Sequence, residues 1–288
     1  MPRKEKKIRA KRPHLLGKLL AMLPVSCALL YPIYLAAQLD TVTVDYLSDA
    51  LPEPFDGLRI VYLSDIHYGA FLKEDRVKSL VDRVNALQPD LILMGGDYSE
   101  DSEGAIRFFE QVKPAFRARI AVLGTVGNHD RTLPEENLQT LKHAMADQGV
   151  IPLVNDVWTA AKEGKTLAIA GVDDYYNGYP DLNKVAALSR GADFTIFLPH
   201  TPDLLPQVYD QLGSVFYQLA LCGHTHGGQV ALFGHSIRSS ADTWDRYRSG
   251  WYHERGADIL VTNGVGTSGL PVRLGARPQI HLITMKRR

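Results

Sequence analysis

The sequence predicts an α/β fold with parallel strands, followed by a part that is mostly β. Short apolar runs typical of buried strands alternate with stretches of helical periodicity from residue 58 to about residue 222. Glycines and polar residues follow the ends of these runs, where ligands gather in parallel sheets. After Gly228 the helical pattern ends and strand candidates remain. Such alternation predicts parallel strands with helices packed against them.

The expected elements follow in a regular order. A strand at 58–63 precedes a helix with apolar positions from Val77 to Leu87, which Pro89 ends. Further strands are predicted at 90–94, 120–126, 193–198 and 215–221. A strand-rich stretch is predicted at 151–172, in which 166–170 is the clearest strand. Further helices are predicted at 105–112, 135–148 and 203–212. Another helix is predicted to end at Ser189, with Asp181 as its N-terminal cap. The β part has strand candidates at 229–233, 258–262 and 279–285.

The charge is unevenly distributed along the 288 residues. Residues 1–18 hold eight basic residues and one acidic residue, so the remainder carries 24 basic and 31 acidic residues, a net charge of −7. An acidic body is a poor surface for nucleic acid, which we therefore do not expect as a partner. Cys27 and Cys222 are the two cysteines, and their contexts predict no structural disulfide.

The N-terminal part predicts a membrane anchor. After the basic segment at 1–18, residues 19–37 carry no charge, which is long enough for a single membrane span. Basic residues before it and acidic ones after it place the N-terminus in the cytoplasm and the catalytic body outside. A cleaved signal peptide and a monotopic anchor with a cytoplasmic body are the alternatives. Residues 38–57 are interpreted as a linker, and 58–288 as one catalytic domain.

Five motifs combine aspartate, asparagine and histidine with small residues. They are Ser64-Asp65-Ile66-His67, Gly95-Gly96-Asp97, Gly127-Asn128-His129-Asp130, Leu198-Pro199-His200 and Gly223-His224-Thr225-His226-Gly227-Gly228. One histidine alone is more often an ordinary polar or core residue than a ligand. Five of the ten histidines fall in these motifs, however. Carboxylate, imidazole and amide oxygens suit Mn²⁺, Fe, Zn²⁺ or Ni²⁺.

In the order of these motifs the chain resembles the calcineurin-like metallophosphoesterase superfamily, over about residues 58–285. The resemblance implies a four-layer α/β/β/α sandwich and a metal-dependent phosphohydrolase. It implies one metal ion held by Asp65, His67, Asp97 and His226, and a second held by Asp97, Asn128, His200 and His224. Asp97 would bridge the two divalent ions, for which we expect Mn²⁺ before Fe, Zn²⁺ or Ni²⁺.

The implied chemistry is hydrolysis of a phosphodiester or pyrophosphate bond. Two such ions share a hydroxide, the expected nucleophile, and neutralise the attacking and leaving oxygens. His129 is expected to give a proton or hydrogen bond to the phosphoryl or leaving-group oxygen. Asp130 is expected to orient and charge the His129 ring.

Within the superfamily the chain resembles a small bacterial branch with an N-terminal membrane segment. The shared marks are that segment, Gly-His-Thr-His-Gly-Gly-Gln, and the stretches at 263–273 and 277–280. This implies a lipid-linked phosphoester substrate, such as a phospholipid or a UDP-2,3-diacylglucosamine-like molecule. The alternatives are soluble nucleotides or phosphoproteins as substrates, and a scaffold without metals.

Three features stay open in the sequence. Asp173 and Asp174 either line the cleft or belong to a solvated turn. Arg273 meets either a substrate phosphate or a carboxylate of the fold. The aromatic stretch from Trp244 to Tyr252 is either a packed surface loop or a membrane- or substrate-facing one.

Overall fold

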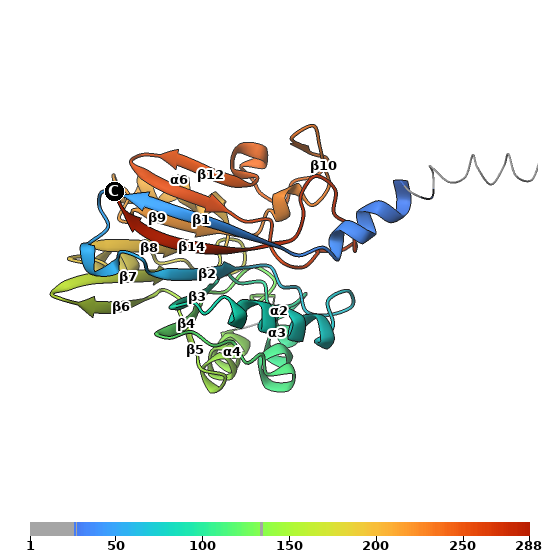
Figure 1. Ribbon diagram of the computed structural model, residues 1–288, viewed down its shortest axis with the longest axis horizontal. Helices are drawn as coiled ribbons and strands as arrows, with labels where there is room; N and C mark the ends of the chain where they lie inside the picture. Colours follow the sequence, from blue (N-terminus) through green and yellow to red (C-terminus); the bar gives the residue numbers. More distant parts are fainter. Residues whose placement is uncertain (1–25, 27, 133–134) are drawn as a thin grey trace, which may run out of the picture.

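Two six-stranded sheets form the centre of the protein in a computed structural model that describes residues 26, 28–132 and 135–288 (Figure 1). The first sheet has the order β1 (Asp40–Ser48), β14 (Gln279–Arg287), β2 (Arg59–Leu63), β3 (Leu91–Met94), β4 (Ala121–Gly124) and β5 (Val150–Pro152). The second has the order β12 (Gly250–Glu254), β13 (Ala257–Val261), β9 (Leu219–Cys222), β8 (Phe194–Leu198), β7 (Lys165–Gly171) and β6 (Asp156–Lys162). A small hairpin joins β10 (Ala231–Leu232) to β11 (His235–Ser236).

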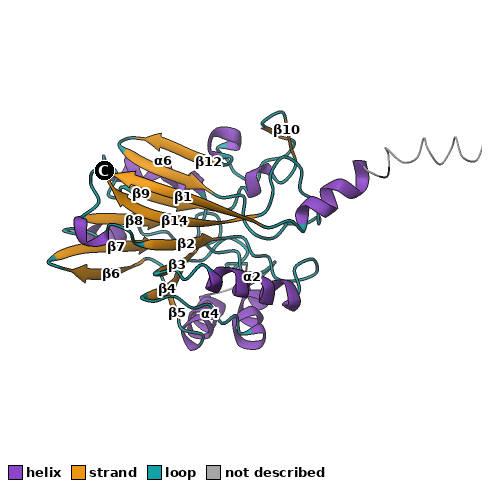
Figure 2. Ribbon diagram, viewed as in Figure 1, coloured by secondary structure: helices purple, strands orange, loops and turns teal. Residues whose placement is uncertain are grey.

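Helices cover the outer faces of both sheets (Figure 2). The first sheet carries α2 (Glu74–Ala86), α3 (Ser102–Arg107) and α4 (Glu135–Asp147), and the second carries α5 (Leu182–Leu188) and α6 (Leu205–Leu212). The predicted helix at 105–112 is α3 followed by a π-helical turn at Phe108–Val112. Asp181 caps α5 as predicted, because its carboxylate accepts a hydrogen bond from the Lys184 amide.

Alternating side chains of each strand build three separate apolar layers. In β2, Val61 and Leu63 pack towards the helices, whereas Ile60 and Tyr62 enter the core between the sheets. The third layer joins the outer face of the second sheet to α5 and α6. Three apolar layers separate four layers of structure, so the predicted α/β sandwich is confirmed.

The strand directions place the five motifs at one end of the sandwich. β2, β3 and β4 are parallel, and so are β8 and β9. A predicted ligand motif begins at the end of each of these strands or within three residues of it. The carboxyl ends of parallel strands meet at one edge, so the motifs gather there.

The interpretation of residues 38–57 as a linker is wrong. Residues 40–48 form β1, which pairs in parallel with β14 over its whole length at the edge of the first sheet. Tyr46, Leu51 and Phe55 are buried in the core between the sheets. Val42, Val44 and Tyr46 alternate with polar residues as in a half-buried strand. The pairing partner, however, lies more than two hundred residues away in sequence, so the local pattern did not show which sheet the strand joins.

The predicted anchor at 19–37 lies mostly outside the described residues, and the basic segment at 1–18 lies wholly outside them. Residues 28–36 are helical and project from the ligand end of the sandwich (Figure 1). In the part of the chain that the structure describes, no helix is long and apolar enough to cross a membrane.

Candidate metal centre

The seven residues predicted as metal ligands lie together at the ligand edge. Asp65, His67 and His226 form one group whose donor atoms lie within 4.8 Å of one another. Asp97, His200 and His224 form a second such group, and Asn128 joins it through His224. A further group contains His67, Asp97 and His129. The structure thus brings together every residue predicted for the site.

Much of this site is built on strained backbone. Five of the seven candidate ligands have positive φ angles: Asp65 (54°), His67 (48°), Asp97 (53°), His224 (68°) and His226 (52°). Residues with side chains rarely adopt this left-handed conformation, and such strain concentrates at functional sites. The unfavourable backbone conformation of these five residues indicates that the positions of their side chains matter for function.

In the first group, imidazole nitrogens and a carboxylate oxygen, all possible metal ligands, lie close to one another. Nε2 of His67 lies 3.1 Å from Nε2 of His226, and the latter lies 3.5 Å from Oδ1 of Asp65. Oδ2 of Asp65 is buried and has no hydrogen-bond partner among the described residues. A buried carboxylate oxygen without a partner is costly unless a cation compensates it.

In the second group, the protonation of the two histidine rings also indicates a cation. Nδ1 of His200 lies 2.7 Å from the Gly95 carbonyl, and Nε2 of His224 lies 3.1 Å from the Ser240 carbonyl. Because a carbonyl only accepts, both of these nitrogens carry protons. The neutral rings then direct lone pairs at Oδ2 of Asp97, at 3.1 Å, and at Oδ1 of Asn128, at 2.8 Å. Lone pairs that face each other require a cation between them, either a proton or a metal ion.

The electrostatics of Asp97 point the same way. Burial lowers the pKa of His200, but the Asp97 carboxylate outweighs burial and raises that pKa to about 10. Burial opposes ionisation of Asp97 as well, yet His200 and His67 hold the pKa of Asp97 well below its ordinary value. The site therefore favours positive charge next to Asp97, and its donor set fits two divalent cations.

Glycine keeps the site compact. A Cβ atom added to Gly127 would lie 2.3 Å from Oδ1 of Asp97 and 2.7 Å from Nε2 of His200. A residue with a side chain at this position would therefore collide with two candidate ligands.

His129 sits at the rim of the site, half-buried. Its backbone amide donates to Oδ1 of Asp97 at 2.9 Å, and its Nδ1 lies 2.8 Å from the Glu100 carbonyl. Burial lowers the pKa of His129, but Asp97 and the Glu100 carbonyl together raise it above its ordinary value. The proton on Nδ1 is thus fixed by Glu100, which leaves Nε2 to exchange protons.

The expectation that Asp130 orients the His129 ring is wrong. The Asp130 carboxylate accepts hydrogen bonds from the amides of Asp97 (2.7 Å), Tyr98 (3.0 Å) and Gly127 (2.9 Å). Through these bonds the Asp130 carboxylate joins the loops that follow β3 and β4. Burial and the Asp97 charge raise the pKa of Asp130 to about 7. Asp130 contributes to the raised pKa of His129 through its charge alone, as the last of four causes.

Sequence reasoning missed the role of Glu100 and left that of Arg273 open. Arg273 is fully buried. It donates to the carbonyls of His226 (2.7 Å), Gly266 and Ala276 (3.3 Å), and its Nη2 lies 3.0 Å from Nδ1 of His226. It therefore binds backbone and a candidate ligand in place of the phosphate or carboxylate considered above. Glu100 carries no sequence signal beyond its position three residues after Asp97.

The other features that the sequence left open have clear contacts in the structure. Asp173 forms a buried ion pair with Arg131 at 2.9 Å, and Asp174 accepts hydrogen bonds from the amides of Tyr176 (2.8 Å) and Asn177 (2.6 Å). Trp251 stacks on Tyr46 with ring centres 5.8 Å apart. Both aspartates are buried, so neither lies in a solvated turn, and Oδ1 of Asp174 has no hydrogen-bond partner among the described residues. Of the aromatic stretch, Trp251 packs on the first sheet, whereas Trp244 is exposed.

A hollow of about 650 Å³ opens beside His226. Residues 225–230 and 237–240, which flank the β10–β11 hairpin, form its walls together with residues 268–272. Its lining mixes polar side chains, among them Gln229 and Arg238, with the apolar side chains of Ile237, Leu270 and Val272. The hollow is therefore suited to a substrate with both polar and apolar parts.

Comparison with known proteins identifies similar chains. Residues 58–236 match the family described as calcineurin-like phosphoesterase. The uncharacterized metallophosphoesterase YkuE of Bacillus subtilis is 31% identical over 245 residues, which cover 83% of this chain and 82% of that one. The phosphodiesterase YaeI of Escherichia coli is 29% identical over 79% of this chain and 82% of its own. A transmembrane protein with a metallophosphoesterase domain from Danio rerio is 29% identical over 93% of this chain, which spans 62% of that protein.

Proposed function

The chain belongs to the calcineurin-like phosphoesterase family and is a metal-dependent phosphohydrolase, and we propose that it hydrolyses a phosphodiester or pyrophosphate bond of a lipid-linked substrate at a membrane. The observation that carries this proposal is the pair of donor groups that share the neighbourhood of Asp97. Asp65, His67, Asp97 and His226 would hold one ion. Asp97, Asn128, His200 and His224 would hold the other, with Mn²⁺ proposed before Fe, Zn²⁺ or Ni²⁺.

Two divalent ions in these positions would activate a water molecule and neutralise the negative charge on the oxygens of the phosphoryl group. The protein's own contribution is to fix the donors and to handle a proton. Oδ1 of Asp97 accepts from the His129 amide, which ties the rim of the site to the carboxylate at its centre. The donor positions are thus set by backbone as well as by side chains.

His129 is the proposed proton donor. Glu100 fixes its Nδ1 proton, and the raised pKa of His129 favours a second proton at Nε2. A protonated Nε2 at the rim gives a hydrogen bond or a proton to the oxygen that leaves the phosphorus. Asp130 supports this indirectly, because it holds together the two loops that carry Asp97 and His129.

Two observations support a lipid-linked substrate over soluble nucleotides or phosphoproteins, which stay the alternative. The hollow beside His226 has apolar side chains from two walls. Several exposed apolar side chains of the helix at 28–36 stand at the same end of the molecule. The uncharged segment at 19–37, with basic residues before it, supports an anchor that holds the body at the membrane.

Hydrolysis of bis-p-nitrophenyl phosphate tests the catalytic proposal. The full chain is stripped of metal, supplied with Mn²⁺, and compared with the His226→Ala and His143→Ala variants. We expect Mn²⁺-dependent turnover that His226→Ala abolishes. His143 is exposed on α4, so its variant should match the unmodified chain. Turnover that persists without metal, or in a folded His226→Ala variant, would contradict the proposal.

The substrate class is tested on the same preparations. Turnover of a phospholipid diester in vesicles is compared with that of cyclic nucleotides and of a phosphopeptide. A preference for the vesicle substrate supports the lipid proposal. Activity confined to the soluble compounds would select the alternative.

A further inference from the structure

We propose that the end of the molecule around the metal centre is a membrane-docking face that lies on a bilayer containing anionic lipids. The docking face consists of the helix at 28–36, Phe71, the β10–β11 hairpin and the loop at 268–272. This inference rests on the proposed function, which it deepens by assigning the surface through which the site meets its substrate.

Topology alone places the helix at the metal-binding end. β1 is parallel to β14, which is antiparallel to β2. β1 therefore begins at the edge where β2 ends, and β2 ends just before Asp65. The helix at 28–36 directly precedes β1. Figure 1 shows it projecting from the end opposite to the C-terminus.

The helix is attached to the body and exposes an apolar surface. The Pro32 carbonyl accepts from the Arg273 amide at 2.9 Å, and the Ala36 carbonyl accepts from Nη2 of Arg76 at 3.2 Å. Leu35 and Ala36 are buried against the body. The large apolar side chains that remain exposed are Leu29, Leu30, Tyr31, Ile33 and Tyr34.

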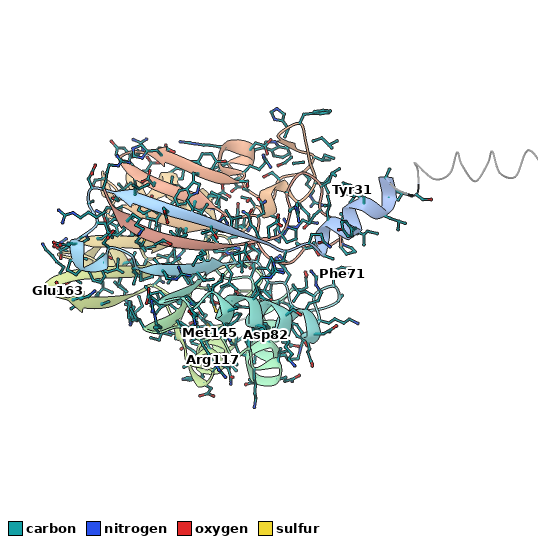
Figure 3. All side chains as sticks on the ribbon, in the orientation of Figure 1. Tyr31, Phe71, Asp82, Arg117, Met145 and Glu163 are labelled. Atoms are coloured by element: carbon teal, nitrogen blue, oxygen red, sulfur yellow. The ribbon has the colours of Figure 1, made fainter. Side chains whose placement is uncertain are left out.

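The body adds apolar side chains at the same end. In Figure 3, Tyr31 and Phe71 both lie towards the end of the molecule from which the helix at 28–36 projects. Phe71 and Leu270 are exposed, and Phe233 in the turn of the hairpin is fully exposed. A water-exposed phenylalanine in a turn gains nothing for the fold, since it packs on no neighbour. Large exposed apolar patches mark sites of interaction.

The loop at 268–272 connects the helix to the metal centre. On one side Pro271 lines a hollow of about 260 Å³ together with Ile33 and Phe71. On its other side Leu270 lines the 650 Å³ hollow together with Ile237 and His226. An apolar surface therefore runs from the helix across this loop to a candidate metal ligand.

The charge of the chain identifies the occupant as an anionic bilayer. Residues 1–18, which precede the helix in sequence, hold eight basic residues and one acidic residue. Each basic residue near an anionic surface contributes about 1 kcal/mol of attraction. Arg238 adds an exposed cation beside Ile237. The remaining body is acidic, with a net charge of −7 beyond residue 18, so the excess of positive charge lies in the segment that precedes the helix. Apolar side chains with flanking cations are the pattern of a lipid interface.

Fluorescence quenching by lipid tests the docking face. The full chain is reconstituted into phosphatidylcholine–phosphatidylglycerol vesicles with brominated acyl chains, in the variants Phe233→Trp, Phe71→Trp and Ile120→Trp. Ile120 is exposed and directly precedes β4, so it lies at the opposite end. The quenching is measured as the increment over the unmodified chain, which has three tryptophans. We expect quenching at 233 and 71 and none at 120. Equal signals at all three positions would overturn the proposal.

Activity separates this proposal from the function on which it rests. We expect Phe233→Ser to lower turnover of a vesicle phosphodiester by about tenfold, because one aromatic side chain no longer inserts into the bilayer. Turnover of bis-p-nitrophenyl phosphate should not change, and Ile120→Ser should affect neither reaction. If quenching is present and the unmodified chain hydrolyses no diester, the docking face stands and the proposed function fails. If the diesters are hydrolysed without quenching, the docking face is wrong and the function stands.

Discussion

Replacement of Arg273 by lysine should destabilise the protein strongly, although the charge is kept. Burial lowers the pKa of Arg273 to about 10, so its guanidinium is charged at neutral pH. It satisfies three carbonyls, that of His226 in the loop after β9 and those of Gly266 and Ala276 in the connection between β13 and β14. A single lysine ammonium cannot reach all three from one position. With two carbonyls left unpaired, at about 1–3 kcal/mol each, we expect a loss of about 3 kcal/mol.

A thermal melt measures this loss. For a chain of this size, 1 kcal/mol corresponds to roughly 2–4 °C, so Arg273→Lys should lower Tm by roughly 6–12 °C. Arg277→Lys is the matched control, because Arg277 is half-exposed and pairs with Asp40 at 2.8 Å. A surface pair of this kind contributes about 0–1 kcal/mol. If Arg273→Lys melted together with Arg277→Lys, the assigned role of the buried guanidinium would be refuted.

Three further predictions concern the site and the core. In Gly96→Ala, a Cβ would lie 2.4 Å from the Gly127 amide in a backbone with φ +94°; Mn²⁺-dependent turnover should be lost, whereas Gly149→Ala, with φ +74° and open space, should keep it. His129→Ala should lower kcat about 10²–10⁴-fold and leave Mn²⁺ binding by calorimetry unchanged; an unchanged kcat would remove the proton-donor role. Burial lowers the pKa of His281 from 6.5 to about 4. Its contribution is complete above about pH 6.5 and is lost as the pH falls towards 4, by about 2 kcal/mol at pH 5. Denaturant unfolding should show a smaller loss between pH 7 and pH 5 in His281→Gln, and an equal loss would contradict this assignment.

The sequence predicted the parts of the fold that depend on local pattern. Runs such as residues 58–63 are apolar because both faces of a central strand are buried, and β2 confirms this. The metal motifs follow such strands directly, so their convergence followed from strand direction. β1 escaped notice because it is an edge strand whose partner is β14, at the other end of the chain.

Roles that depend on contacts between distant loops were not predictable. Asp130 follows His129 in sequence, yet its carboxylate meets amides of Asp97 and Tyr98 from another loop. Arg273 acts through the backbone of two loops. Glu100 meets His129 through its carbonyl, which every residue possesses, although its carboxylate also lies 3.4 Å from Nδ1 of His67. Residue type gives no information about such backbone interactions.

Anomalous diffraction from crystals soaked with Mn²⁺ tests the central claim most directly, namely that Asp97 lies between two metal ions. The account predicts two peaks on either side of Asp97, about 3.5–4 Å apart. One should contact Asp65, His67 and His226, and the other should contact Asn128, His200 and His224. A single peak, or a peak that has His129 as a ligand in place of these residues, would contradict it.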